Sequence, residues 1–276
     1  MNFADIEPGL RLAYRIDDHT DPWRPTDTVL MVHGLAESGE SWRAWVPHLS
    51  RHHRLLRPDL RGYGQSTPMA GDYQWRLDRL VQDLIALLDR LELERVHVVG
   101  AKIGGTIGLR LAAMHPDRVI SLSAIGAPVS LTSFAERAPA WRKQIREHGV
   151  KPWAQATMNG RLGSGLPDAA VAWWVDLMAK TAPSTLEGFL QMVPTVDVTP
   201  CLDAIRAPTL VVTTTGSQLG STNEVEQWQR KISGSQLEIL PGDSYHVAAS
   251  DPDACAALVA AFLAQHPAED LLRLRT

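Results

Sequence analysis

The stretch Val96-His97-Val98-Val99-Gly100-Ala101-Lys102-Ile103-Gly104-Gly105, residues 96–105, joins a short apolar run to a glycine-rich turn. The run at 96–99 is typical of a strand buried on both faces of a parallel sheet. From Ile103 to Met114 the sequence predicts a helix. The stretch therefore predicts one strand–turn–helix unit with Lys102 in the turn.

The same alternation of strands and helices extends in both directions from this unit. Strands are predicted at 10–16, where apolar and polar residues alternate, and at 29–32, 55–58, 119–125, 210–212 and 237–240. Helices are predicted at 42–49 and 77–91, after the capping-box sequence 221–224, and after Asp251-Pro252. This alternation predicts an α/β fold with a mostly parallel sheet and helices on both of its faces.

The alternation stops between about Pro128 and Pro200. Helical patterns occur there without a convincing buried strand. We interpret residues 128–200 as a helical lid, or cap, inserted over the end of the sheet where ligands bind. Residues 1–127 and 201–276 then form the core.

Three segments rich in glycine and polar residues follow predicted strands. They are His33-Gly34-Leu35-Ala36, the run 59–66 and the run 100–105, and a later segment, 242–246, ends in His246. In order and spacing these segments resemble the α/β-hydrolase superfamily over essentially the whole chain. The layout is most similar to the 3-oxoadipate enol-lactonase-like group. The resemblance implies an α/β-hydrolase fold with a nucleophile in the turn at 100–105.

The resemblance also implies a Ser–acid–His triad, and here the chain departs from it. The family carries serine between the glycines of its Gly-x-Ser-x-Gly turn, whereas this chain has Lys102. The position matching the family's acid is Ser217, and an alternative acid position holds Ala127 and Pro128. His246 remains as the matching histidine. Since a single change already abolishes hydrolysis, the loss of two triad members favours a natural reassignment of the site.

A lysine in this turn has two chemical uses. Burial lowers the pKa of an amine by roughly 3–5 units at most, and a neutral lysine can form a Schiff base with a ketone. A charged lysine can instead hold a carboxylate or stabilise an enolate. By resemblance, the backbone amides of Leu35 and Ile103 form an oxyanion hole, and His246 serves as general acid or base. Glu37 is the nearest candidate carboxylate, with Asp243 and Glu224 as weaker candidates.

A substrate pocket is expected above this site. Its predicted lining residues are His33, Glu37, Trp141, Trp153, Trp173 and Trp174. For His33 a role in supporting the turn is the stronger interpretation, and each tryptophan is as compatible with core packing. Four basic residues of the insertion could receive a substrate carboxylate, but each is expected to be solvated at the surface; these are Arg137, Arg142, Lys143 and Arg161.

The overall composition is that of a soluble globular enzyme. The net charge of -4 and the pI near 6.2 give no reason to expect nucleic acid or an anionic membrane as a partner. There is no apolar run long enough to span a membrane and no apolar stretch at the N-terminus, so a cytoplasmic protein is expected. Cys201 and Cys255 are expected to be reduced. Neither a metal nor an organic cofactor is expected, and the oligomeric state stays open.

These observations predict an enzyme that acts on a small carbonyl compound, such as a keto acid or an enol-lactone-like metabolite. It would use Lys102 with His246 and the oxyanion hole. Carbon–carbon cleavage, decarboxylation and an atypical hydrolysis all remain open as the reaction. The alternative is a ligand receptor or pseudo-hydrolase that keeps the pocket and has lost its chemistry.

Overall fold

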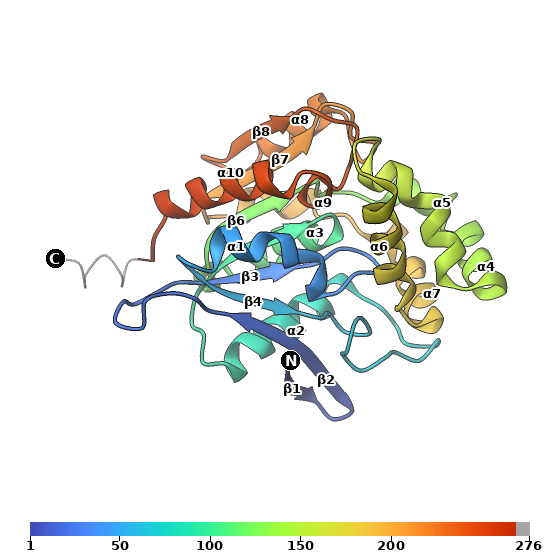
Figure 1. Ribbon diagram of the computed structural model, residues 1–276, viewed down its shortest axis with the longest axis horizontal. Coiled ribbons are helices and arrows are strands. Elements are labelled where there is room, and N and C mark those ends of the chain that lie inside the picture. The colour runs from blue at the N-terminus through green and yellow to red at the C-terminus, as the bar shows by residue number, and fades with distance from the viewer. Residues whose placement is uncertain (269–276) are drawn as a thin grey trace.

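The computed structural model describes residues 1–268 and contains one eight-stranded sheet (Figure 1). The strands, in the order in which they lie across the sheet, are β1 (Asn2–Glu7), β2 (Leu10–Asp17), β4 (Arg54–Pro58), β3 (Thr28–Val32), β5 (Val96–Ala101), β6 (Val119–Ile125), β7 (Thr209–Thr214) and β8 (Gln236–Leu240). β1 pairs antiparallel with β2, and β2 antiparallel with β4, whereas the pairs from β4 to β8 are parallel. The predicted α/β-hydrolase fold class, with its mostly parallel sheet, is confirmed.

Helices cover both faces because successive residues of a buried strand point to opposite sides. Leu30 and Val98 face a core that includes residues of α2 (Leu77–Arg90) and α3 (Ile103–Met114). Their neighbours Met31 and Val99 face a second core with Trp45 and Phe262. That second face is covered by α1 (Val46–Leu49) and α10 (Pro252–Gln265). Two further helices, α8 (Thr222–Gln229) and α9 (Val247–Ser250), complete the core elements.

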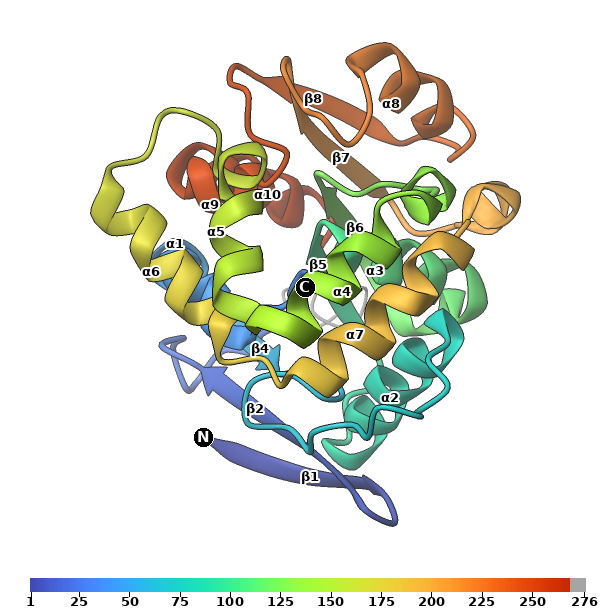
Figure 2. The same cartoon turned by 90° about the vertical axis from the view of Figure 1, so that its right-hand side faces the viewer.

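The segment predicted to interrupt the alternation is helical. It contains α4 (Ala138–His148), α5 (Val150–Leu162), α6 (Asp168–Ala179) and α7 (Pro183–Met192). Short 3-10 turns flank these helices at Thr132–Ala135, Val193–Thr195 and Thr199–Ala204. Figure 1 shows the four helices gathered at the end of the sheet toward which β3 points, and Figure 2 looks directly onto them.

Two local predictions need correction. The helix expected at 42–49 is a 3-10 turn at Gly39–Trp45 followed by the short α1. Pro47 lacks a backbone N–H, so it cannot continue a regular ladder of helical hydrogen bonds through this segment. β1 was not predicted, since only Ala4 of its six residues is buried and the strand lies at the edge of the sheet. The remaining 3-10 turn, Pro116–Arg118, leads into β6.

No helix within residues 1–268 has the length and apolar character needed to cross a membrane. Cys201 is half-buried and Cys255 is buried, and both are free thiols. Burial, followed by the nearby carboxylate of Asp251, raises the pKa of the Cys255 thiol well above its usual value. Cys255 therefore packs as an inert apolar side chain.

Candidate active site

Lys102 occupies a strained turn between β5 and α3. Its backbone angles are φ 53° and ψ −125°, a left-handed conformation that residues with a Cβ rarely adopt. Its N–H donates to Ile125 O at 2.9 Å, which ties the turn to β6. A Cβ on Gly100 would collide with the Gly104 carbonyl, and one on Gly104 would collide with the carbonyl of Val32. The glycines thus permit the close approach of strand and helix that projects the lysine from the end of the sheet.

The Lys102 amine is paired with a carboxylate. Glu37 Oε1 accepts a hydrogen bond from Lys102 Nζ, and Glu37 Oε2 accepts one from the Gly34 N–H at 3.0 Å. The two side chains are 4% and 1% exposed. Nε2 of His246 lies 3.1 Å from the same Oε1 atom. The structure therefore brings Lys102, His246 and Glu37 together.

Both ring nitrogens of His246 are buried and make no aligned hydrogen bond with the described residues. The Nε2 contact with Glu37 is close, but the ring does not direct its N–H along it. The backbone around the ring is fixed, because the His246 N–H donates to Arg161 O at 3.0 Å and to Ser244 Oγ at 2.9 Å. Trp174 packs edge-on against the imidazole with 5.2 Å between ring centroids. A buried imidazole held this close to a carboxylate can exchange a proton with it.

Burial dominates the electrostatics of these three groups. It lowers the pKa of Lys102 to about 8, against the opposing effect of Glu37. Burial, followed by the charge of Lys102, lowers the pKa of His246 to about 4, so this histidine is neutral at pH 7. Burial alone would raise the pKa of Glu37, but the adjacent Lys102 and His246 outweigh it and hold that pKa well below its usual range. At neutral pH the site holds a carboxylate, a neutral imidazole and an amine near its own titration point.

The other candidate acids are engaged elsewhere. Glu224 completes the capping box of α8 with Ser221, and Asp243 accepts a hydrogen bond from the Ser164 N–H at 3.1 Å. Ser217 Oγ accepts one from the Leu219 N–H at 3.3 Å. Of the carboxylates considered from the sequence, Glu37 is thus the one that meets His246.

A small cavity of about 60 Å³ opens beside Lys102. Leu35 and Ile103, whose backbone amides are the expected oxyanion-hole donors, are among its lining residues. The Ile103 amide is at the first position of α3, where an N–H has no partner within the helix. Most other lining side chains are apolar: Pro128, Leu131, Phe134, Trp141, Phe189, Leu190, Val193 and Leu219, together with Arg161 and Tyr245.

Trp141 is the predicted pocket residue that the structure places in this lining, and the other five lie elsewhere. His33 is fully buried; its Nδ1 lies 2.8 Å from Gly34 O, and its Nε2 accepts from the Leu60 N–H at 2.9 Å. It supports the turn. Glu37 is held behind Lys102 by the contacts described above.

Trp153 belongs to the core among the helices and is 0% exposed. Trp173 and Trp174 line a separate hollow with Arg43 and Pro252, although Trp174 also contacts His246. Sequence periodicity placed these rings on helices, but it could not tell which helical face meets the cavity.

Arg161 is the lining residue that the sequence analysis assigned wrongly. It was expected at the surface, yet it is 3% exposed. Ala154 and Met158 are buried on the same helix, seven and three residues before Arg161. This spacing is typical of one helical face, and it is the sequence signal that predicts a buried position for Arg161.

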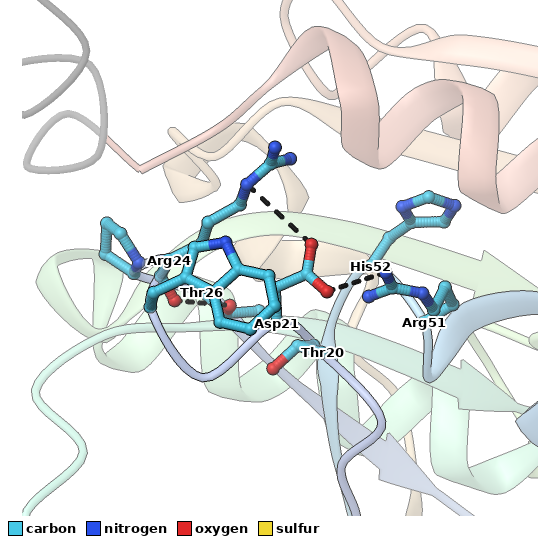
Figure 3. Close-up of a pocket in the computed structure, with 8 residues that line it drawn as sticks. Thr20, Asp21, Arg24, Thr26, Arg51 and His52 are labelled. Carbon is cyan, nitrogen blue, oxygen red and sulfur yellow. Dashed lines mark hydrogen bonds and ion pairs between the residues drawn. The ribbon is translucent and has the colours of Figure 1, made fainter.

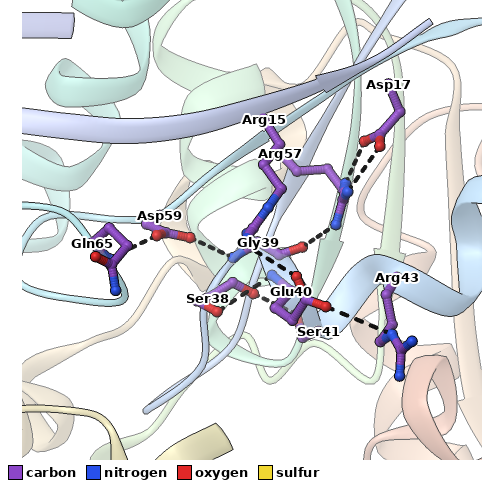
Figure 4. Close-up of polar contacts among 10 residues, drawn as sticks. All are labelled: Arg15, Asp17, Ser38, Gly39, Glu40, Ser41, Arg43, Arg57, Asp59 and Gln65. Atoms are coloured by element: carbon purple, nitrogen blue, oxygen red, sulfur yellow. Dashed lines mark hydrogen bonds and ion pairs between the residues drawn. The ribbon is translucent and has the colours of Figure 1, made fainter. Parts of the chain in front are cut away.

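A polar network fixes the loop that carries Glu37 (Figure 4). The buried guanidinium of Arg57 donates to Gly39 O at 2.7 Å and pairs with Asp17 at 2.6 Å. Asp59 Oδ1 accepts from the Gly39 N–H at 2.7 Å, and its Oδ2 accepts from the Gln65 N–H at 2.8 Å. The loop is therefore anchored to the segment after β4, which restricts where the Glu37 carboxylate can lie.

A larger hollow, about 640 Å³, lies between residues 20–26 and the pair Arg51 and His52 (Figure 3). Its residues 20–26 precede β3, whereas Lys102 follows β5. Because β3 and β5 are parallel, the hollow lies at the N-terminal ends of the strands and Lys102 at their C-terminal ends. Asp21 already pairs with Arg24 and Arg51. Among the described lining residues of this hollow, the one carboxylate is therefore already paired within the lining itself.

Comparison with known proteins identifies the family. The alpha/beta hydrolase fold family matches residues 27–253. The chain belongs to this family. It is 26% identical over 258 residues to a putative carbamate hydrolase RutD from Caulobacter sp. (strain K31), covering 89% of this chain and 93% of that protein.

Other relatives match a part of their length. The chain is 36% identical over 102 residues to the 2-hydroxymuconate semialdehyde hydrolase of Pseudomonas sp. (strain CF600), which is 36% of each protein. The first three curated relatives are matched over 36%, 40% and 42% of their own length. Among solved structures, the enol-lactonase from Burkholderia xenovorans LB400 superposes with a TM-score of 0.87 at 23% identity, covering 95% of this chain and 100% of that one. That likeness is one of fold.

Proposed function

We propose that this protein is an enzyme acting on a small carbonyl compound, with Lys102 in the place where the family resemblance implies a nucleophilic serine. The observation that carries the proposal is the cavity lining. Lys102 is the one primary amine in that lining, and the described lining residues include no serine, threonine or cysteine. At a pKa of about 8, roughly one tenth of the amine is neutral at pH 7. This fraction can attack a carbonyl carbon.

The proposed reaction begins when Lys102 Nζ bonds to the carbonyl carbon. The electron pair of the C=O bond moves to oxygen, where the amides of Leu35 and Ile103 stabilise it. Proton transfers through His246 release that oxygen as water and leave an iminium ion. The iminium accepts the electron pair of the bond between the next two carbons and becomes an enamine, while a hydroxyl on the outer carbon loses its proton, so that the outer fragment leaves as an aldehyde or ketone. Protonation at carbon and hydrolysis then regenerate Lys102 and release the product.

In this scheme Glu37 is a positioning residue. Its carboxylate contacts both Nζ of Lys102 and Nε2 of His246. It keeps the pKa of Lys102 higher than burial alone would allow. The helices α4–α7 act as the lid, because α4, α5 and α7 contribute side chains that close the cavity over Lys102. Reaction in a closed, water-poor site favours the neutral amine.

One observation favours the alternative of a ligand-binding protein without chemistry. The ion pair with Glu37 holds the Lys102 amine in place. If that pair never opens, the cavity can bind a ligand while the amine stays unreactive.

Borohydride trapping separates the two functions. The chain has five lysines, and the other four, Lys143, Lys151, Lys180 and Lys231, are exposed. Incubation with 3-oxobutanoate or 4-oxopentanoate and borohydride should reduce an imine at Lys102, detected by mass spectrometry of its peptide. The Lys102→Met variant is the control and should show no adduct above the level at the exposed lysines. Adducts confined to those exposed lysines in the wild-type protein would overturn the imine mechanism.

A further inference from the structure

Arg161 differs from the other buried arginines of the described chain. Arg57 and Arg61 are 5% and 2% exposed, and they pair with Asp17 and Asp83 respectively, with shortest contacts of 2.6 Å. Arg161 is 3% exposed, but no Asp or Glu oxygen within residues 1–268 lies within 4.0 Å of its guanidinium. A buried arginine without a counter-ion is costly, since burial removes the water that would solvate its charge.

The contacts that Arg161 does make leave most of its donors free. Its Nε donates to Thr157 Oγ1 at 3.3 Å, one turn earlier on α5. Its Cζ lies 5.0 Å from the centroid of the Trp153 ring and 6.0 Å from that of Tyr245. These rings attract the cation and hold the planar group in place, but they accept no hydrogen bond from its Nη atoms. Within the described residues the two Nη groups have no acceptor.

Arg161 is one of the residues that line the cavity. Arg161 and Lys102 line the same small space, together with mostly apolar side chains. The charges near this space are two cations, Arg161 and the ionised form of Lys102, and one carboxylate, Glu37. Glu37 is engaged by Lys102 and the Gly34 amide. The cavity therefore has an uncompensated positive charge and a planar fork of N–H donors.

We infer that Arg161 is the binding site for a carboxylate of the substrate, so that the substrate is an oxo acid rather than a neutral ketone, ester or lactone. A guanidinium binds a carboxylate through two parallel hydrogen bonds, a geometry that a lysine or an aromatic ring does not offer. The inference rests on the proposed function in one respect, namely that the carbonyl group of the same substrate contacts Lys102.

The binding affinities of matched acids and esters test the inference independently of turnover. The probes are pyruvate, 3-oxobutanoate, 4-oxopentanoate and 5-oxohexanoate, each compared with its methyl ester by isothermal titration calorimetry. The esters keep the shape and the carbonyl group but lack the charge. At the best spacing, the acid should bind roughly 10- to 100-fold more tightly than its ester, the range expected for a buried charge-assisted hydrogen-bond pair. Equal affinity of acid and ester throughout the series would overturn the inference.

Variants assign the preference to one residue. Arg161→Gln should abolish the difference between acid and ester, whereas Arg161→Lys should retain part of it. Arg137→Gln removes the same charge from an exposed position at the start of α4 and should leave the difference unchanged. A preference that survives in Arg161→Gln, or that disappears equally in Arg137→Gln, would contradict the assignment.

The Lys102→Met variant separates this inference from the proposed function. It cannot form an imine, yet it should still prefer acid over ester because Arg161 is intact. A preserved preference without borohydride trapping in the wild-type protein would support the carboxylate site and refute the imine. Trapping of the methyl esters as efficiently as the acids would support the imine and refute the carboxylate site.

Discussion

Replacing Glu37 by glutamine is the perturbation that probes the site most selectively. The amide preserves the shape of the side chain but removes the negative charge that opposes the effect of burial on Lys102. A hydrogen bond to a charged group is worth about 1.5–3 kcal/mol, which corresponds to about 1–2 pKa units. The pKa of Lys102 should therefore fall from about 8 to about 6–7.

The expected consequence is a pH-dependent change in reactivity. At pH 7 the neutral fraction of the amine should rise from roughly one tenth to half or more, so borohydride trapping at Lys102 should become about fivefold to tenfold faster. At pH 9 the amine is largely neutral in both proteins, and the two rates should converge. The assay is the yield of reduced adduct on the Lys102 peptide, measured from pH 5 to 10 at fixed concentrations of ketone and borohydride.

A matched control comes from the same loop. Glu40 is half-buried and pairs with Arg15 and Arg43 rather than with Lys102. Glu40→Gln removes a charge of the same sign three residues away and should leave the midpoint of the pH profile unchanged. An unchanged or raised midpoint in Glu37→Gln would refute the claim that Glu37 sets the pKa of Lys102.

Three further outcomes follow from the same contacts. Lys102→Ser should hydrolyse p-nitrophenyl acetate little faster than buffer, because His246 has no hydrogen-bonded acid on Nδ1 and its Nε2 lies against Glu37; rapid release of p-nitrophenolate would show that another group supplies the acid. Lys102→Met should lose about 3–5 kcal/mol of unfolding free energy, measured in urea, because the Glu37 carboxylate stays buried without its counter-ion. Adding Glu37→Gln should recover most of that loss, and additive effects of the two changes would contradict the coupling between Lys102 and Glu37. Because the folded-state pKa of His246, about 4, lies below the ordinary value of 6.5, the unfolded chain takes up a proton first on acidification. Through His246 alone, about 3 kcal/mol of stability should thus be lost as the pH falls from 6.5 to 4, and His246→Gln should remove this part of the slope in urea titrations at several pH values. The slope due to His53, whose pKa burial also lowers to about 4, should remain in both proteins.

The fold could be predicted because its pattern is local. Each buried strand is a short apolar run, and the turn at 100–105 requires glycine at positions that a single sequence displays. β1 escaped prediction because an edge strand with one buried residue has little apolar pattern to detect. The 3-10 turn at Gly39–Trp45 could not be predicted from the aromatic spacing, because Trp42, Trp45 and Leu49 are spaced as in a regular helix.

The site could be predicted where a residue follows directly from a turn. Lys102, Leu35 and Ile103 are placed by the ends of β3 and β5, and all three line the cavity. The partner of Lys102 could only be suggested, since the direction of the Glu37 side chain depends on contacts with Gly34 and with a loop more than 200 residues later. The burial of Arg161 likewise depends on the way α5 packs against the segment that carries Tyr245.

The central claim is that a buried amine in the strand–helix turn is available in its neutral form. The most direct test is the titration of protein labelled with ¹³C-lysine, following the Cε chemical shifts by NMR from pH 5 to 11. The account predicts that one of the five lysines titrates near pH 8, that this signal is absent from Lys102→Met, and that its midpoint falls in Glu37→Gln. If Lys102 instead titrates at or above the ordinary lysine pKa of 10.5, the amine is held charged by Glu37 and the proposed chemistry is contradicted.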